Sequence, residues 1–273
     1  MTDATTAALV GATGGAGTTR FTLETAGLLA REGHSVAVFD AAFATQGLGD
    51  ALAGPLDPDL TSVLTEEATL AEAGVELPVA SVDADGGPDA DAATTADHGG
   101  HEPGPGSVTC YPAAAPFTRL AEAKTAAAAR RFETLLGEAA DRVDYVLCDT
   151  PPVAANQSVS AVNAVDRVAV IAPATTRGAD AVARTDARLA DVGVAPDLVL
   201  ANEGATPATN ADAVEADVTV PQSETTTLAD APSVATDETV RPAVATVAAE
   251  LLDADVTVSD ETDGSRLDGL LSG

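Results

Sequence analysis

Short apolar runs rich in β-branched residues alternate with longer stretches of helical periodicity along most of this chain. Such alternation is typical of an α/β protein with a doubly wound, mainly parallel sheet and helices on both faces. In the 117–140 stretch, for example, Phe132, Leu135 and Leu136 fall on one helical face. The predicted strands are 6–12, 35–40, 107–111, 143–149, 167–172 and 197–202, and the predicted helices are 19–32, 60–73, 117–140, 178–192 and 241–253.

Residues 83–106 interrupt this rhythm. The segment carries six acidic residues, no basic residue and no apolar period. A segment of this composition cannot bury enough apolar surface to offset the entropy of ordering, so we expect a disordered surface insertion. His98 and His101 lie within it, but neither cysteines nor fixed carboxylates accompany them, which disfavours a metal site.

The chain of 273 residues suits one large α/β domain, which we place at 1–253, followed by an acidic flexible tail at 254–273. Its 43 acidic residues against 13 basic ones give a formal net charge of −30. Self-repulsion on this scale opposes compaction, and molar salt shortens the screening length to about 3 Å. The composition therefore indicates an extreme halophile with a salt-loaded cytoplasm, and it does not by itself indicate a basic partner.

Cys110 and Cys148 both lie in apolar runs, where a cysteine most often serves as a small buried hydrophobic side chain. The N-terminal residues do not resemble a secretory leader, and no apolar run approaches the ~20 residues of a membrane span. We therefore expect a cytoplasmic protein.

A glycine-rich loop separates the first predicted strand from the first predicted helix. Residues 9–21 read LVGATGGAGTTRF, in which the glycines leave the chain free to curl and Thr18 and Thr19 open the helix. Backbone N–H groups of such loops bind phosphate oxygens, helped by the positive end of the helix dipole. A working loop carries a lysine immediately before the Ser/Thr. Here that position is Thr18, so the glycine frame of a phosphate loop is present without its cation.

This loop resembles the deviant Walker A motif, KGGxGKTT, of the MinD/ParA family of P-loop ATPases. The resemblance places the signature lysine of that motif at Thr13 and its phosphate-loop lysine at Thr18. It places the magnesium-binding threonine at Thr19 and the last threonine at Arg20. The match implies the P-loop NTPase-like fold of the family, while the two lost lysines argue against its ordinary chemistry.

Further segments resemble the family in the same order along the chain. The strand ending at Asp40 corresponds to a family strand ending in Asp-x-Asp, whose second aspartate polarises the attacking water and is Ala42 here. The run DYVLCDTPP at 144–152 corresponds to the Walker B strand and places Asp149 at the magnesium-facing aspartate. Asn202 ends a later strand, where the family has an asparagine that reads adenine.

The resemblance implies a site for ATP and Mg²⁺, with binding that is weak or dependent on a partner. A charge-assisted hydrogen bond contributes about 1.5–3 kcal/mol, so the loss of lysine at position 18 should weaken triphosphate binding about 10- to 150-fold. The implied nucleotide-binding residues are Gly14, Gly15, Ala16, Gly17, Thr18, Thr19, Arg20 and Asn202, and the implied magnesium ligands are Thr19, Asp40 and Asp149.

Two of these residues have alternative interpretations. Asp149 could instead be an aspartate that caps the turn after its strand. Arg20 could partly replace the missing lysine, because a cation in the first turn of a helix opposes the dipole and favours a nearby anion. Equally, Arg20 could lie on the solvent face.

Catalysis of phosphoryl transfer depends on positioning and charge stabilisation. Residues for both are missing at Thr13, Thr18 and Ala42, so no catalytic residue is assigned. We interpret the chain as a pseudo-ATPase regulator or adaptor in cell division, partitioning or positioning. Two alternatives stay open, a slow but genuine ATPase and a nucleotide-free structural adaptor.

The expected partner is a protein, and a MinD/ParA relative with both lysines intact is the candidate. Nucleic acid is not expected, because the chain lacks a basic patch that would replace counterions. The tail sets Leu267, Leu270 and Leu271 at helical spacing. One arginine, Arg266, supplies little attraction to anionic lipid, so a small docking motif is favoured over a membrane anchor.

Overall fold

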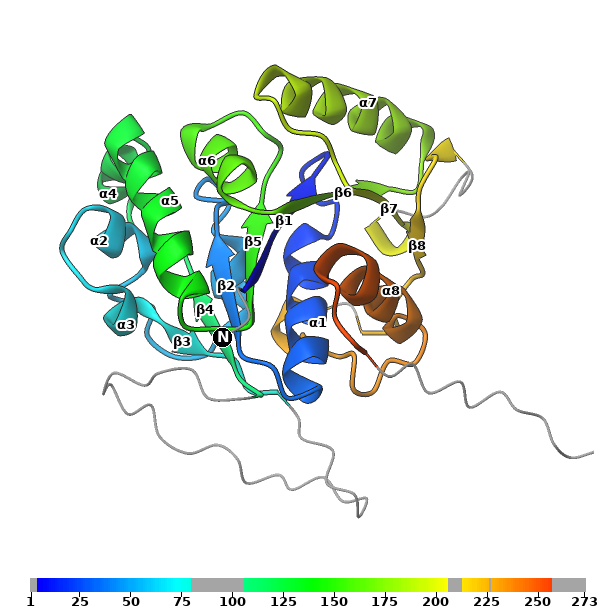
Figure 1. The fold of residues 1–273 in the computed structure, drawn as a ribbon, viewed down its shortest axis with the longest axis horizontal. Helices are drawn as coiled ribbons and strands as arrows, with labels where there is room; N and C mark the ends of the chain where they lie inside the picture. The colour runs from blue at the N-terminus through cyan, green and yellow to red at the C-terminus, as the bar shows by residue number, and fades with distance from the viewer. Residues whose placement is uncertain (1–3, 80–105, 206–212, 226, 257–273) are drawn as a thin grey trace, which may run out of the picture.

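An eight-stranded sheet forms the centre of the protein (Figure 1), in the order β3-β4-β2-β5-β1-β6-β7-β8. Neighbouring strands run parallel, except that β3 and β4 are antiparallel. The strands are β1 (Thr5–Gly11), β2 (Val36–Asp40), β3 (Val75–Glu76), β4 (Val108–Tyr111), β5 (Tyr145–Thr150), β6 (Arg167–Pro173), β7 (Leu198–Asn202) and β8 (Val218–Val220).

The structure is a computed structural model that describes residues 4–79, 106–205, 213–225 and 227–256. Apart from Gly106, the insertion expected at 83–106 lies outside these residues, together with His98 and His101. The tail beyond Val256, with its three leucines, also lies outside them. The expectations for these segments stay predictions.

Helices cover both faces of the sheet (Figure 1). On one face α1 and α8 pack against each other, over a core that includes Leu9 and Ile171. On the other face α5, α6 and α7 cover a second core, which includes Val10 and Phe39. The helices are α1 (Thr18–Arg31), α2 (Leu60–Leu64), α3 (Leu70–Ala73), α4 (Phe117–Ala123), α5 (Ala126–Ala140), α6 (Asn156–Ala164), α7 (Thr176–Asp191) and α8 (Arg241–Leu252), and the 3₁₀ turns are η1 (Gly47–Ala51), η2 (Glu203–Ala205) and η4 (Leu228–Asp230).

The predicted α/β class and all six predicted strands are confirmed, with ends that differ by at most two residues. The central strands β1 and β5 are buried almost throughout, because helices cover both faces of the sheet. This burial explains why they read as near-continuous apolar runs. The edge strands β3 and β8 were not predicted, since two or three residues carry no readable period.

Two predicted helices are wrong in extent, because each is broken into two. The predicted helix at 60–73 is α2 and α3, and the chain turns between them at Glu66, whose φ is 62°. The predicted helix at 117–140 is α4 and α5, and the side chain of Thr125 caps the start of α5.

One helix, α6, was not predicted at all. Much of its buried face consists of polar side chains, among them Gln157, Ser158 and Ser160. A polar buried face leaves no apolar stripe in the sequence, so the hydrophobic period that marks the other helices is missing.

Candidate phosphate-binding site

The glycine-rich loop lies between the end of β1 and the start of α1, at the carboxyl edge of the sheet. Gly14 and Gly15 are exposed at its tip, whereas Ala16 is buried. Gly17 has a φ of 89° and precedes the first turn of α1, which has no side-chain cap and no acidic residue. The backbone N–H groups of this turn are therefore free of side-chain acceptors, the arrangement that binds phosphate at helix N-termini.

Asn202, at the end of β7, is tied to this loop. Its Nδ2 atom donates a 2.9 Å hydrogen bond to the carbonyl oxygen of Ala16, and its Oδ1 atom accepts one of 2.9 Å from the N–H of Gly204. A Cβ atom at Gly17 would collide with the Asn202 amide. Position 17 therefore requires glycine both for its positive φ and for this close approach.

Thr18 lies where a phosphate loop has its lysine, and its side chain turns back toward β1. It is nearly buried, and a Cβ atom at Gly11 would lie 2.6 Å from its Oγ1 atom. A hydroxyl group can hydrogen-bond to a phosphate but brings no positive charge. The structure thus places Thr18 at the loop, where its side chain supplies no positive charge.

Thr19 and Asp149 meet directly beneath the loop. The Thr19 hydroxyl donates a 2.6 Å hydrogen bond to Oδ2 of Asp149. Asp149 lies near the end of β5, and its side chain is buried. Burial raises the pKa of the Asp149 carboxyl, and the hydrogen bond from Thr19 partly opposes that rise.

Asp40 is the neighbour of Asp149 in the register of β2 and β5. It is completely buried, and burial followed by the charge of Asp149 raises the pKa of its carboxyl. Its oxygens accept hydrogen bonds from the N–H groups of Ala42 (2.7 Å) and Ala113 (3.3 Å). Two adjoining buried carboxylates favour either a bound cation or a retained proton, because their charges repel each other.

Ala42 is buried and follows β2 by two residues, with its N–H group bound to Asp40. Its methyl group replaces the carboxylate that the resemblance places at this position. Thr13 lies half-buried in the loop and likewise carries no charge.

No family model matches this chain, and no curated protein matches it. Solved structures do match, and the three described below are 16–18% identical to this chain. One is the septum site-determining protein MinD complexed with Mg-ADP from Pyrococcus horikoshii OT3, with a TM-score of 0.59, 16% identity and coverage of 80% of this chain and 82% of that one. Another is the cell division ATPase MinD of Pyrococcus furiosus, with a TM-score of 0.54, 16% identity and coverage of 78% and 83%.

A third match is cobyrinic acid a,c-diamide synthase from Mycobacterium smegmatis with bound ATP analog and magnesium. It has a TM-score of 0.56 and 18% identity, and the match covers 80% of this chain and 84% of the synthase. The chain has the MinD-like P-loop fold. Because proteins with different activities share it, the MinD-like fold alone does not assign the reaction.

Within this MinD-like fold, Arg20 is mostly buried and forms contacts within the protein. Its Nη2 atom contacts Glu24 (3.3 Å) and the hydroxyl oxygens of Ser223 (3.2 Å) and Ser233 (2.8 Å). The side chain is 20% exposed, so it does not lie on the solvent face. Its guanidinium group donates hydrogen bonds to serines in the segment after β8. These residues are far from Arg20 in the sequence, so no local motif predicts the contact.

The MinD-like fold also brings two further segments to the loop. A Cβ atom at Gly47 would lie 3.4 Å from Thr19 Oγ1, so the start of η1 borders the Thr19–Asp149 pair. A Cβ atom at Gly204 would lie 3.5 Å from the Cα atom of Gln222, so the residues after β8 adjoin the Asn202 turn.

The donor set suits magnesium. In the part of the chain that the structure describes, no group of three or more His, Cys, Asp or Glu side chains is placed to hold a metal ion. Mg²⁺ does not need such a group, because it usually takes one or two carboxylates and completes its shell with waters and phosphate oxygens. Thr19 and Asp149 fit that requirement, whereas both oxygens of Asp40 already accept hydrogen bonds from backbone N–H groups.

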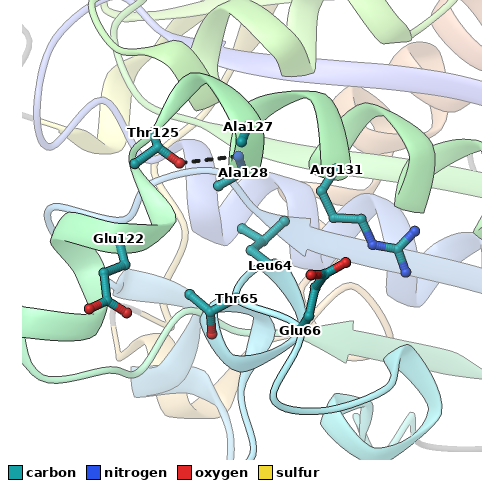
Figure 2. Close-up of a pocket in the computed structure, with 8 residues that line it drawn as sticks. All are labelled: Leu64, Thr65, Glu66, Glu122, Thr125, Ala127, Ala128 and Arg131. Atoms are coloured by element: carbon teal, nitrogen blue, oxygen red, sulfur yellow. Dashed lines mark hydrogen bonds between the residues drawn. The ribbon is translucent and has the colours of Figure 1, made fainter.

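A surface hollow of about 390 Å³ lies elsewhere, between the end of α2 and the junction of α4 and α5 (Figure 2). Glu66, Glu122 and Arg131 lie at its rim, and Arg131 is paired with Glu138 at 2.8 Å. Its lining contains no residue of the phosphate loop, so the hollow is separate from the candidate site. Among the described residues, no helix is both long and apolar enough to cross a membrane.

Proposed function

We propose that this protein is a MinD/ParA-like regulator or adaptor in cell division, partitioning or positioning, and that it binds nucleotide without ordinary ATP hydrolysis. The observation that supports this most directly is the 2.6 Å contact between Thr19 and Asp149 beneath a loop whose lysine position is Thr18. The loop keeps the features that hold a magnesium-bound phosphate and lacks the charge that makes binding strong. The cytoplasm is the proposed location.

The proposed binding residues follow from the geometry of the loop. Backbone N–H groups from Gly14 to Thr19 would hold the phosphates at the N-terminus of α1. Thr19 and Asp149 would hold Mg²⁺, which when bound neutralises charge on the phosphate oxygens. Asn202 would contact the base. To do so, its amide must break the hydrogen bond to the carbonyl of Ala16 and form one to the ligand.

The proposed lack of hydrolysis rests on groups that are missing. Ala42 cannot orient or polarise a water molecule, and Thr13 cannot bring charge to the phosphates of a second subunit. Thr18 cannot stabilise charge that develops in the transition state. Positioning and charge stabilisation supply almost all of the catalysis in phosphoryl transfer, so the loss of all three groups should leave little turnover.

A partner would supply what this chain lacks. In the MinD/ParA family, which this chain resembles, two subunits close over two nucleotides, and the signature lysine of each subunit contacts the nucleotide of the other. A heterodimer with an intact relative would direct one lysine into the site of this chain. A homodimer would bring two triphosphates together with neither lysine present, and salt screens such repulsion poorly in a dry interface.

A nucleotide-free structural adaptor is the second candidate, and a specific observation favours it. The Asn202 amide is bonded to Ala16, and the Thr18 hydroxyl lies against Gly11, so both side chains already have partners within the protein. In that case the fold would serve only as a docking surface.

Calorimetric titration with ATP and Mg²⁺ in molar KCl tests the proposal against this alternative. Binding that weakens in Asp149→Ala supports the nucleotide-binding regulator. Absence of binding at millimolar ATP, both alone and with the intact relative, would favour the structural adaptor.

A further inference from the structure

Arg20 connects the phosphate-loop helix to the segment that follows β8. Its Nη2 atom lies 2.8 Å from the hydroxyl oxygen of Ser233 and 3.2 Å from that of Ser223. Ser223 in turn donates a hydrogen bond to the buried carboxylate of Asp237. One guanidinium group therefore joins the first turn of α1 to two points of the segment after β8.

Glu24, one turn further along α1, holds the same segment from inside the protein. Its side chain is 1% exposed and accepts hydrogen bonds from the N–H of Ser233 (2.7 Å), the hydroxyl of Ser233 (2.8 Å) and the N–H of Val234 (2.7 Å). Arg20 adds the positive charge to this group at 3.3 Å. A buried carboxylate needs both hydrogen bonds and a counter-charge, so Arg20 and Glu24 act as one unit.

The segment after β8, of which the structure describes 221–225 and 227–234, is held by this unit and borders the candidate site. Its start adjoins Gly204, whose N–H is bonded to Asn202, and Asn202 is bonded to the phosphate loop. Its η4 turn packs against η1, which borders Thr19. The segment thus lies beside the phosphate loop, with its start near the Asn202 turn and its η4 turn near η1.

We infer that Arg20 is a positioning residue, which fixes the described part of the segment after β8 as the wall for the base of a bound nucleotide and does not itself bind phosphate. This inference rests on the nucleotide site proposed above. One nitrogen of the guanidinium group, Nη2, contacts two serine hydroxyls and a carboxylate. The helix dipole disfavours a cation in the first turn of α1, and these partners stabilise Arg20 there without a phosphate.

The inference predicts different effects on ligands with and without a base. Loss of the Arg20 contacts would let the residues around Ser223 and Ser233 leave their places for part of the time. The apparent affinity for ATP falls in proportion to the fraction in place, so a segment in place one-tenth of the time gives about a tenfold weaker affinity. Inorganic tripolyphosphate has no base, and its affinity should change by less than about twofold.

The experiment compares the full chain with its Arg20→Ala, Arg20→Lys and Ser233→Ala variants in molar KCl with Mg²⁺. Titration calorimetry gives the affinities for ATP and for tripolyphosphate, and hydrogen exchange reports the N–H groups of Ser233 and Val234. Arg130→Ala is the matched control, because Arg130 is exposed on α5, on the opposite face of the sheet. If Arg20→Ala does not fold, the comparison uses Arg20→Lys, which keeps the charge and loses the Nη2 atom that makes these contacts, and Ser233→Ala, which leaves Arg20 in place.

The expected result is a selective loss of ATP affinity with faster exchange at Ser233 and Val234, while Arg130→Ala behaves as the wild type. An equal loss of ATP and tripolyphosphate affinity in the Arg20 variants would overturn the inference in favour of a direct phosphate contact. Unchanged ATP affinity would overturn it as well. Failure of the wild type to bind either ligand is a different outcome, which refutes the proposed function together with this inference.

Discussion

The hydroxyl group of Thr19 donates a 2.6 Å hydrogen bond to the carboxylate of Asp149, which lies 130 positions further along the chain. The contact joins the first turn of α1 to the end of β5, the strand that pairs with β1. Both groups are the ones that we propose to hold a magnesium ion. Asp149 therefore provides the control for the first prediction.

The isolated protein should hydrolyse ATP at or near the background rate in molar KCl with Mg²⁺. Thr13, Thr18 and Ala42 lack the groups that position water and stabilise charge in the transition state. Phosphate release measured over hours would give the rate. Turnover that exceeds background and disappears in Asp149→Ala would contradict the prediction, since a contaminating ATPase would not respond to that substitution.

Restoring a cation to the loop should strengthen nucleotide binding. Thr18→Lys is expected to tighten ATP binding about 10- to 150-fold, because it adds a charge-assisted hydrogen bond of about 1.5–3 kcal/mol. The measurement is a titration with ATP and Mg²⁺ in molar KCl.

Thr13→Lys is the control for that substitution, because the signature lysine is expected to act across a dimer. It adds the same charge to the same loop and should leave the ATP affinity of a dilute monomer nearly unchanged. Equal gains in ATP affinity in the two variants would contradict the prediction, because they would show that any positive charge near the loop has the same effect, whatever its position.

Gly17→Ala should destabilise the protein, because position 17 has a φ of 89° and an added Cβ atom would meet the Asn202 amide. The left-handed conformation alone costs about 1–2 kcal/mol in the free energy of unfolding for a residue with a side chain. Chemical denaturation in molar KCl would measure the change. Gly14→Ala is the control and should stay within about 0.5 kcal/mol of the wild type, since a Cβ atom there meets nothing within 4 Å.

Mixing experiments should reveal the partner dependence of assembly. Light scattering with ATP is expected to give a monomer for this chain alone and a mixed dimer with the intact relative, whose lysine would enter the site of this chain. A nucleotide-dependent homodimer would falsify this prediction, and so would the absence of a mixed dimer.

The sequence predicted the parts of the fold that repeat a simple pattern. Buried strands such as β1 and β5 are apolar throughout, and the Asp149 strand ends in a recognisable motif. The pattern failed where polar side chains form the buried face, as Gln157 and Ser158 do in α6. It also failed where one residue breaks a helix, as at Glu66 and Thr125, because turns of this kind depend on single backbone angles and caps.

The candidate site was predictable at the loop and not at its borders. Thr18, Thr19 and Asp149 occupy motif positions, so their neighbourhood follows from the motif. The partners of Arg20 lie 203 and 213 positions away, and serines in an acidic segment give no sign of a buried carboxylate opposite them. Glu24 looks like an ordinary helix-surface glutamate until the fold brings Ser233 to it.

The packing of α8 on α1 has a consequence for how the protein is made. A ribosome adds α1 early and supplies Arg241–Leu252 only after every strand of the sheet has been synthesised. Until then the apolar residues of α1 lack the cover that α8 later provides. A fragment that stops after β8 would therefore carry the whole phosphate loop, yet it should remain a client of chaperones and prone to aggregate.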